Sequence, residues 1–157
     1  MGTLYTAYAE TPYTVLTADT SSIMELLGDA DVVAKLCEFS ISFNGTSATQ
    51  APILVKLRQI TATGTGSACT EVAVQRSAKS TSQVQAKHTL TVEPTMVATV
   101  ALGQWYVHPQ GGLLIVQYPL GREPVICDGS AGQGLALELT SASGVTPAAA
   151  CYMTWEE

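Results

Sequence analysis

Apolar residues alternate with polar ones at every second position through most of this 157-residue chain. In the clearest stretch, three leucines at 135, 137 and 139 are interleaved with Ala136 and Glu138. A period of two places successive side chains on opposite faces of a β-strand. Similar alternation occurs in residues 37–43, 53–58, 72–75, 89–93 and 151–155. The helical period of 3.6 is sustained over no useful length, so the sequence predicts an all-β fold.

Gly, Pro, Ser and Asn separate these segments, as is typical of short antiparallel strands joined by turns. The length suits one domain, and no alternation of strands with helices indicates a parallel sheet. We therefore predict a single-domain jelly-roll or β-sandwich of about eight to ten short strands. Two local patterns are specific: Asn44-Gly45 predicts a hairpin turn, and the apolar run 113–118 predicts a strand buried on both faces. Residues 63–67 are expected to form a turn.

The first twenty residues are rich in Thr, Tyr and Ala and are expected to form an extended arm, with the domain spanning residues 21–157. Tyr5, Tyr8 and Tyr13 are unusual in a disordered tail, because such tails are poor in aromatic residues. The arm could dock on a neighbouring protein or on its own domain, and the sequence favours neither. Residues 21–28 are the one segment expected to form a helical turn, with Gly28 ending it.

Charged residues make up 13% of the chain, and 13 acidic against 7 basic residues give a net charge of -6. Nucleic-acid binding needs clustered Lys and Arg, which are scattered here, and an acidic chain does not favour anionic membranes. A surface so poor in charge has two explanations. Either Ser, Thr and Gln supply the polarity, or partners cover much of the surface.

No apolar run approaches the roughly 20 residues that span a bilayer, and the start lacks the pattern of a signal peptide. We expect a protein that stays in the cytoplasm or is assembled there into something larger. The four cysteines form no C-x-x-C pair, so no zinc or redox motif is present. Cys37 and Cys151 are expected to be buried thiols, while Cys69 and Cys127, beside Gly-rich stretches, remain open to reactivity.

Catalytic patterns are weak. His108 precedes a turn with no second histidine or carboxylate near it in sequence, and His88 is expected to point outward from a strand. The segment Asp128-Gly129-Ser130 is more typical of a turn than of a nucleophilic serine. Glu71, Glu93, Glu123 and Glu138 are spread over separate elements. We expect no catalytic residue, no metal site and no cofactor.

The last 60 residues or so resemble the small β-rich decoration (cement) proteins of tailed-bacteriophage capsids. The resemblance rests on residues 105–112 (Trp-Tyr-Val-His-Pro-Gln-Gly-Gly), 118–124 (Tyr-Pro-Leu-Gly-Arg-Glu-Pro), 132–135 and 155–157. It implies a jelly-roll subunit that forms homotrimers on the outside of a phage head. There it would clamp neighbouring copies of the major capsid protein, with no reaction and no cofactor.

Six residues are predicted to lie at interfaces of such an assembly: Leu4, Tyr5, Tyr8, Tyr13, Trp105 and Tyr106. An alternative function is a carbohydrate- or receptor-binding jelly roll of a phage tail or fibre, with Trp105, Tyr106 and Tyr118 stacking on sugars. A small enzyme using His108 or Glu123 is the third and weakest hypothesis.

Overall fold

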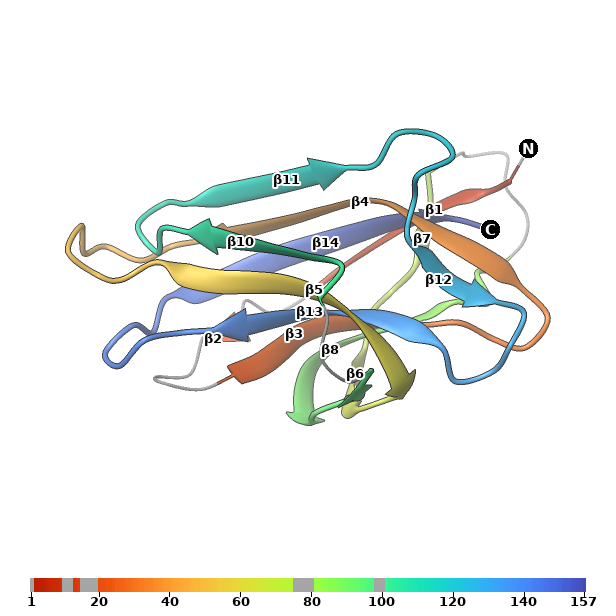
Figure 1. The fold of residues 1–157 in the computed structure, drawn as a ribbon, viewed down its shortest axis with the longest axis horizontal. Coiled ribbons are helices and arrows are strands. Elements are labelled where there is room, and N and C mark those ends of the chain that lie inside the picture. Colours follow the sequence, from red (N-terminus) through yellow and green to blue (C-terminus); the bar gives the residue numbers. More distant parts are fainter. Residues whose placement is uncertain (1, 10–12, 15–19, 75–80, 98–100) are drawn as a thin grey trace.

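The computed structural model describes residues 2–9, 13–14, 20–74, 81–97 and 101–157, with only the backbone path of 13–14. The described residues form strands and turns, without a helix (Figure 1). The strands are β1 (Leu4–Tyr8), β2 (Tyr13–Thr14), β3 (Thr20–Leu27), β4 (Val33–Phe43), β5 (Ile53–Ala62), β6 (Thr65–Ala68), β7 (Val72–Ala73), β8 (Gln85–Val92), β9 (Thr95–Met96), β10 (Gly103–Val107), β11 (Leu113–Gln117), β12 (Val125–Asp128), β13 (Gly134–Thr140) and β14 (Ala148–Glu156).

The strands form two antiparallel sheets. Sheet A has the order β11-β4-β14-β1-β7, with β12 also pairing with β4 and β2 with β14. Sheet B has the order β10-β5-β13-β3-β8-β6, with β9 also pairing with β5. The predicted all-β sandwich is therefore confirmed.

Eight of these strands have the connectivity of a jelly roll. Taken along the chain as β1, β3, β4, β5, β10, β11, β13 and β14, they divide into the sheets β1-β14-β4-β11 and β3-β13-β5-β10. Two four-stranded sheets interleaved in this way form the double Greek key of that fold. The segment from β6 to β9 is an insertion between β5 and β10, and it widens sheet B beyond β3.

The core lies between the inner faces of the two sheets. Leu135, Leu137 and Leu139 face it from β13, as the alternation predicts, and all three are fully buried. Trp155 on β14 is fully buried too, and its ring stacks on Tyr5 of β1 at a centroid distance of 6.1 Å. Large apolar side chains from both sheets thus exclude water from one continuous core.

Residues 20–27 form strand β3, so the predicted helical turn there is wrong. The strand lies between β13 and β8, and its residues 21–26 are all buried. A register shift opposite Leu137 and Glu138 places Ile23 and Met24, adjacent in sequence, both in the core. Burial on two faces together with this bulge removes the period-two pattern that marks other strands.

The hairpin turn predicted at Asn44-Gly45 does not form: these two residues begin the connection 44–52, whose turn lies at residues 48–49. Strand β4 belongs to sheet A and β5 to sheet B, so the connection crosses from one sheet to the other. The Asn44 side-chain oxygen accepts a hydrogen bond from Ala148 N at 2.8 Å, and Gly45 N donates to Pro109 O at 2.8 Å. A Cβ at position 45 would lie 2.5 Å from that carbonyl oxygen, so the close approach requires glycine.

Three further expectations are corrected. Strand β11 (Leu113–Gln117) is an edge strand with Leu113 and Ile115 more than half exposed, and is not buried on both faces. Residues 65–67 of the expected turn belong to β6. His88 is buried rather than outward-facing.

The expected N-terminal arm is partly described. Leu4–Tyr8 forms β1, which pairs with β14 along its whole length and with β7 on its other edge. In this part the arm packs on its own domain, one of the two arrangements that the sequence left open. Residues 1, 10–12 and 15–19 lie outside the described part of the chain.

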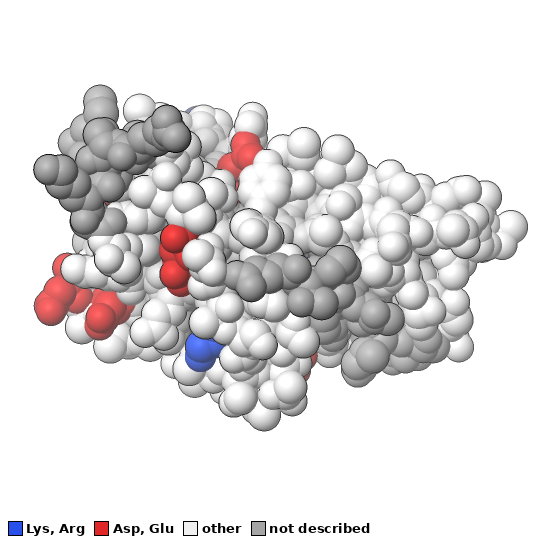
Figure 2. All heavy atoms as spheres, turned by 180° about the vertical axis from the view of Figure 1, so that it is seen from behind, with Lys and Arg blue, Asp and Glu red and all other residues white. Residues whose placement is uncertain are grey.

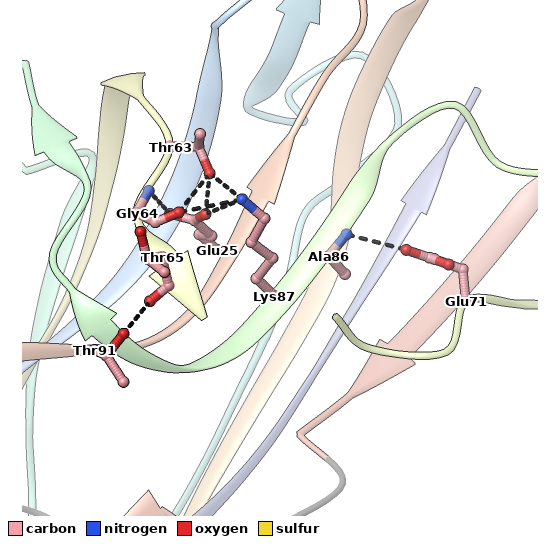
Figure 3. A network of polar contacts seen from close by, with 8 residues as sticks. All are labelled: Glu25, Thr63, Gly64, Thr65, Glu71, Ala86, Lys87 and Thr91. Carbon is pink, nitrogen blue, oxygen red and sulfur yellow. Dashed lines mark hydrogen bonds and ion pairs between the residues drawn. The ribbon is translucent and has the colours of Figure 1, made fainter. Parts of the chain in front are cut away.

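A buried carboxylate attaches the insertion to the jelly roll (Figure 3). The side chain of Glu25 on β3 is fully buried and accepts hydrogen bonds from Thr63 Oγ1 at 2.5 Å and Gly64 N at 3.0 Å. Lys87 Nζ on β8 lies 3.7 Å from Glu25 Oε1 and donates to Thr63 Oγ1 at 2.6 Å. The network joins β3 to β8 and to the turn that leads into β6.

Replacing Glu25 by alanine should therefore destabilise the domain strongly. Glu25→Ala removes the acceptor of the Gly64 amide and the charge partner of the Lys87 ammonium, and breaking a buried pair in this way costs roughly 3–5 kcal/mol. Glu25→Gln keeps an acceptor oxygen and should lose less. Urea denaturation measures both. The control is Glu123→Ala, at a more accessible turn, which should change the unfolding free energy by less than about 1 kcal/mol. Equal losses for Glu25→Ala and the control would contradict this role.

Candidate functional site

The two histidines are held by local contacts. The His88 Nδ1 atom lies 2.8 Å from Thr89 Oγ1, and the His108 Nδ1 atom accepts a hydrogen bond from Gln110 N at 3.0 Å. Within the described part of the chain, neither ring contacts a carboxylate. Neither histidine therefore has the oriented base–carboxylate arrangement that a triad requires.

The four candidate carboxylates are apart and have structural partners. Glu71 accepts from Ala86 N at 3.1 Å and Glu93 from Ser22 N at 2.8 Å. Glu123 accepts from Gly121 N at 2.7 Å. Glu138 lies on the outer face of sheet B, where Lys56 and Arg58 each approach it to 3.2 Å. Each carboxylate thus supports a strand or a turn.

No group of three or more His, Cys, Asp or Glu that could hold a metal occurs among the described residues. The same residues include no helix long and apolar enough to cross a membrane.

The cysteines differ in accessibility from what the sequence predicts. Cys151 is buried as expected, and Cys69 and Cys127 are buried as well. Cys37 is only half-buried, because a register shift between β4 and β14 turns it away from the core face that Phe39 occupies. Burial, reinforced by the negative charges of Glu156 and Glu123, raises the pKa of the Cys37 thiol.

The predicted interface residues do not gather in one place. On β1, Leu4 is half-buried, Tyr5 is buried against Trp155, and Tyr8 is 53% exposed. Tyr5 therefore contributes to the fold rather than to an outer surface. Tyr13 lies on β2, and its side chain is outside the described part of the structure.

The aromatic residues of β10 point in opposite directions. Trp105 packs on Phe39 in an edge-to-face arrangement, with ring centroids 5.4 Å apart. Tyr106, the next residue, faces away from the core and is 74% exposed. Tyr118 packs against the core from another element. The three residues of the sugar-stacking hypothesis are therefore not brought together on one surface.

A much larger feature is an end of the sandwich where the described turns carry no charge. Residues 39–55, 94–121 and 139–155 contain no Lys, Arg, Asp or Glu. The fold brings these segments together at one end, where turns 44–52, 108–112 and 141–147 join the two sheets, on the left in Figure 1. We call these three turns and the adjoining strand ends the uncharged end. Its turns are bonded to one another: Asn44 N donates to Ala148 O at 3.0 Å, and Gln50 Nε2 donates to Gly144 O at 3.2 Å.

Figure 2 shows the molecule from behind, so that the uncharged end lies on its right. Most of the acidic and basic groups visible in this view lie in the left half, and the described atoms at the right-hand end are uncharged. On this face, the charge of the described residues is therefore segregated along the long axis of the domain. The exposed groups at the uncharged end are hydroxyls, amides, backbone and small apolar side chains.

A hollow lies on the outer face of sheet A, where residues of β1, β4, β11 and β14 line it. It is lined by Leu4, Thr6, Cys37, Glu38, Val74, Gln117, Tyr118 and Thr154. The Glu38 carboxylate accepts hydrogen bonds from Gln117 Nε2 and from Tyr152 OH. The bond to Glu38 is the main cause that raises the pKa of Tyr152. Hydroxyl, amide and carboxylate groups beside tyrosine rings are compatible with a small polar ligand.

No protein-family model matches the sequence, and no curated protein matches it. Among solved structures, the chain is similar to the VP2 subviral particle protein of infectious bursal disease virus, with 13% identity and a TM-score of 0.22. The match covers 98% of this chain and 41% of VP2. A structure of the Gx strain of the same virus matches with 11% identity and a TM-score of 0.14, covering 98% of this chain and 38% of that one. The chain thus spans less than half of either protein, and likenesses at these TM-scores carry no weight for its function.

The accessibility of Cys37 gives a direct test of the bulge in β4. Cys37 should react first with a thiol reagent in the native protein, since the other three thiols are buried. Because its pKa is raised, the thiolate fraction at neutral pH is small, so the labelling rate should keep rising up to and beyond pH 9. Mass spectrometry after limited labelling at several pH values measures this. Cys37→Ser should remove the fast phase, and equal labelling of all four native cysteines would contradict the structure.

Proposed function

We propose that this protein is a structural subunit of a virion, a decoration protein that forms homotrimers and binds the outer surface of a capsid. The observation that carries the proposal is the uncharged end. A free surface normally carries charged residues on about a quarter or more of its positions. An end whose three described turns contain none suits permanent contact with another protein.

The segregation of charge gives the subunit an orientation. The core of a protein interface is depleted of charged residues, whereas a solvated surface retains them. With the uncharged end against the shell, the acidic half of the domain would face solvent. The net charge of -6 would then keep the decorated particles soluble and apart.

The jelly-roll topology agrees with this role, because jelly rolls serve in viral capsid and lectin domains. Such an analogy concerns the fold and is weaker than a site argument. The resemblance of residues 105–112 and 118–124 to phage decoration proteins points to the same use. The proposal involves no reaction and no cofactor.

Several weak contacts would be enough for stable attachment. A trimer offers three copies of the uncharged end, and linked binding events combine to an affinity well above that of any one of them. Three linked contacts through an uncharged surface of hydroxyls and amides can therefore reach the affinity that a single contact would need a large apolar patch to reach.

Adding charge to the uncharged end should weaken binding to the shell. Ala48 and Thr146 are exposed there, and Ala48→Glu with Thr146→Glu should lower the affinity for capsid shells at least tenfold, since buried unpaired carboxylates are costly. The matched control is Ser130→Glu with Ala131→Glu, two exposed positions of a turn outside that end, which adds the same charge. Co-sedimentation with shells of the encoding virus, prepared without this protein, measures the affinity.

Two results would contradict the proposal. One is a wild-type protein that does not sediment with shells. The other is equal binding by the two double variants. A particle image that places the domain inside the shell or on the tail would also be incompatible with decoration of the outer surface.

The hollow on sheet A supports a second candidate, binding of a carbohydrate or receptor by a tail or fibre module. Glu38, Gln117 and Thr154, which line it, offer the hydrogen-bonding groups, rather than the set built on Trp105. Glycan-array binding that is lost in Gln117→Ala, with unchanged thermal unfolding, would favour this function. Array binding that Gln117→Ala leaves unchanged would exclude the hollow.

A further inference from the structure

The two sides of the sandwich are closed differently. On one side, β7 covers the edge of β1, and β8 and then β6 extend sheet B beyond β3. The outermost strands there are short, with two residues in β7 and four in β6. Short edge strands are one way in which proteins avoid unwanted pairing. On the other side, β11 ends sheet A and β10 ends sheet B, and no described strand pairs with their outer edges. We call this the open side.

The core reaches the surface at the open side. Trp105 on β10 and Leu114 and Val116 on β11 point inward against the core, yet all three are only partly buried. Their counterparts on the inner strands, such as Phe39 and Ile41, are fully buried. No described strand pairs with β10 or β11 on this side to bury these three side chains further.

The backbone of β11 is available for pairing. Gly112 O accepts from Phe43 N and Tyr118 N donates to Cys37 O, so the even-numbered residues of this stretch bond to β4. Because antiparallel strands alternate the direction of their backbone groups, those of Leu113, Ile115 and Gln117 face the open edge. Neither β10 nor β11 carries a charged residue or a proline that would discourage pairing.

Two different apolar patches flank the open side. Leu113 and Ile115, exposed by 61% and 52%, lie on the outer face of sheet A. Tyr106, exposed by 74%, lies on the outer face of sheet B, and Leu102 just before β10 is 47% exposed. Two copies of a chain with a net charge of -6 repel each other, so they meet at least cost through surfaces without charge. The open side lies within residues 94–121, which carry none.

We propose that the open side binds a second copy of this chain in a head-to-tail arrangement, with the β11 patch of one copy against the β10 patch of the next. An interface between two unlike patches is heterologous, and such contacts close into a ring when the rotation allows it. Three copies would bury the exposed core residues around a common axis. The inference rests on the homotrimer of the proposed function and identifies the surface that forms it.

Charge substitution on each patch tests the arrangement. Ile115→Lys and Tyr106→Glu, each alone, should convert a species of about 49 kDa, three times 16.4 kDa, into a monomer of 16.4 kDa. The chain carrying both changes should regain the trimer, because each lysine then meets the glutamate of the next copy. A two-fold dimer that pairs β11 with β11 would bring lysine against lysine and would not recover, whereas one that pairs β11 with β10 would recover at about 33 kDa, twice 16.4 kDa. The control is Val92→Lys on β8, which is 59% exposed and should leave the trimer intact.

Light scattering after size-exclusion chromatography measures the mass, and circular dichroism with thermal unfolding verifies that each variant is folded. A wild-type monomer at every concentration, trimers in either single variant, or a double variant that stays monomeric would overturn the inference. Shell binding is scored separately. Trimers that do not bind shells would contradict the proposed function alone. Shell binding by a monomeric wild-type protein would contradict only this inference.

Discussion

The structure depends on the mutual burial of the inner faces of two sheets. Trp155 is a large side chain of that contact: it is fully buried, stacks on Tyr5, and sits on β14 between β4 and β1. Because one face of every main strand is committed to this core, the outer faces are free to differ. The outer face of sheet B carries Glu138 between Lys56 and Arg58. The strand ends that adjoin the three turns of the uncharged end carry no charge.

This division relates the fold to an assembly role. Jelly-roll connectivity collects the turns 44–52, 108–112 and 141–147 at one end, so three charge-free segments that are distant in sequence become one surface. One of these charge-free segments, residues 94–121, also contains β10 and β11, whose outer edges pair with no described strand. A single compositional property, the lack of ionised groups, thus marks both an end for contact with a shell and a side for contact with another copy.

The period-two pattern predicted the fold class and most of the core, because strands with one buried face show it directly. The pattern failed where burial depends on a bulge or on the position of the strand within its sheet. In β3, a bulge and burial on both faces produced a pattern like that of a helix around Ile23 and Met24. The apolar run of β11 has the composition of a central strand, and only the topology makes it an edge. Asn44-Gly45 indicated a hairpin turn, but the connection that begins there leads to the other sheet. The uncharged end was visible in the sequence as three charge-free segments, yet their convergence required the strand order.

The pairing of β1 with β14 has a consequence for how the domain is made. Leu4 is opposite Glu156 in that register, so strands from the two extremes of this sequence lie next to each other in the middle of sheet A. Contacts between such distant segments close slowly, since the intervening chain must first be ordered. During synthesis, β4 would lack its neighbour β14 until residues 148–156 have emerged, and its apolar face would be exposed to other nascent chains in the meantime. The yield of correctly folded subunits should therefore fall with temperature and concentration sooner than the stability of the finished domain.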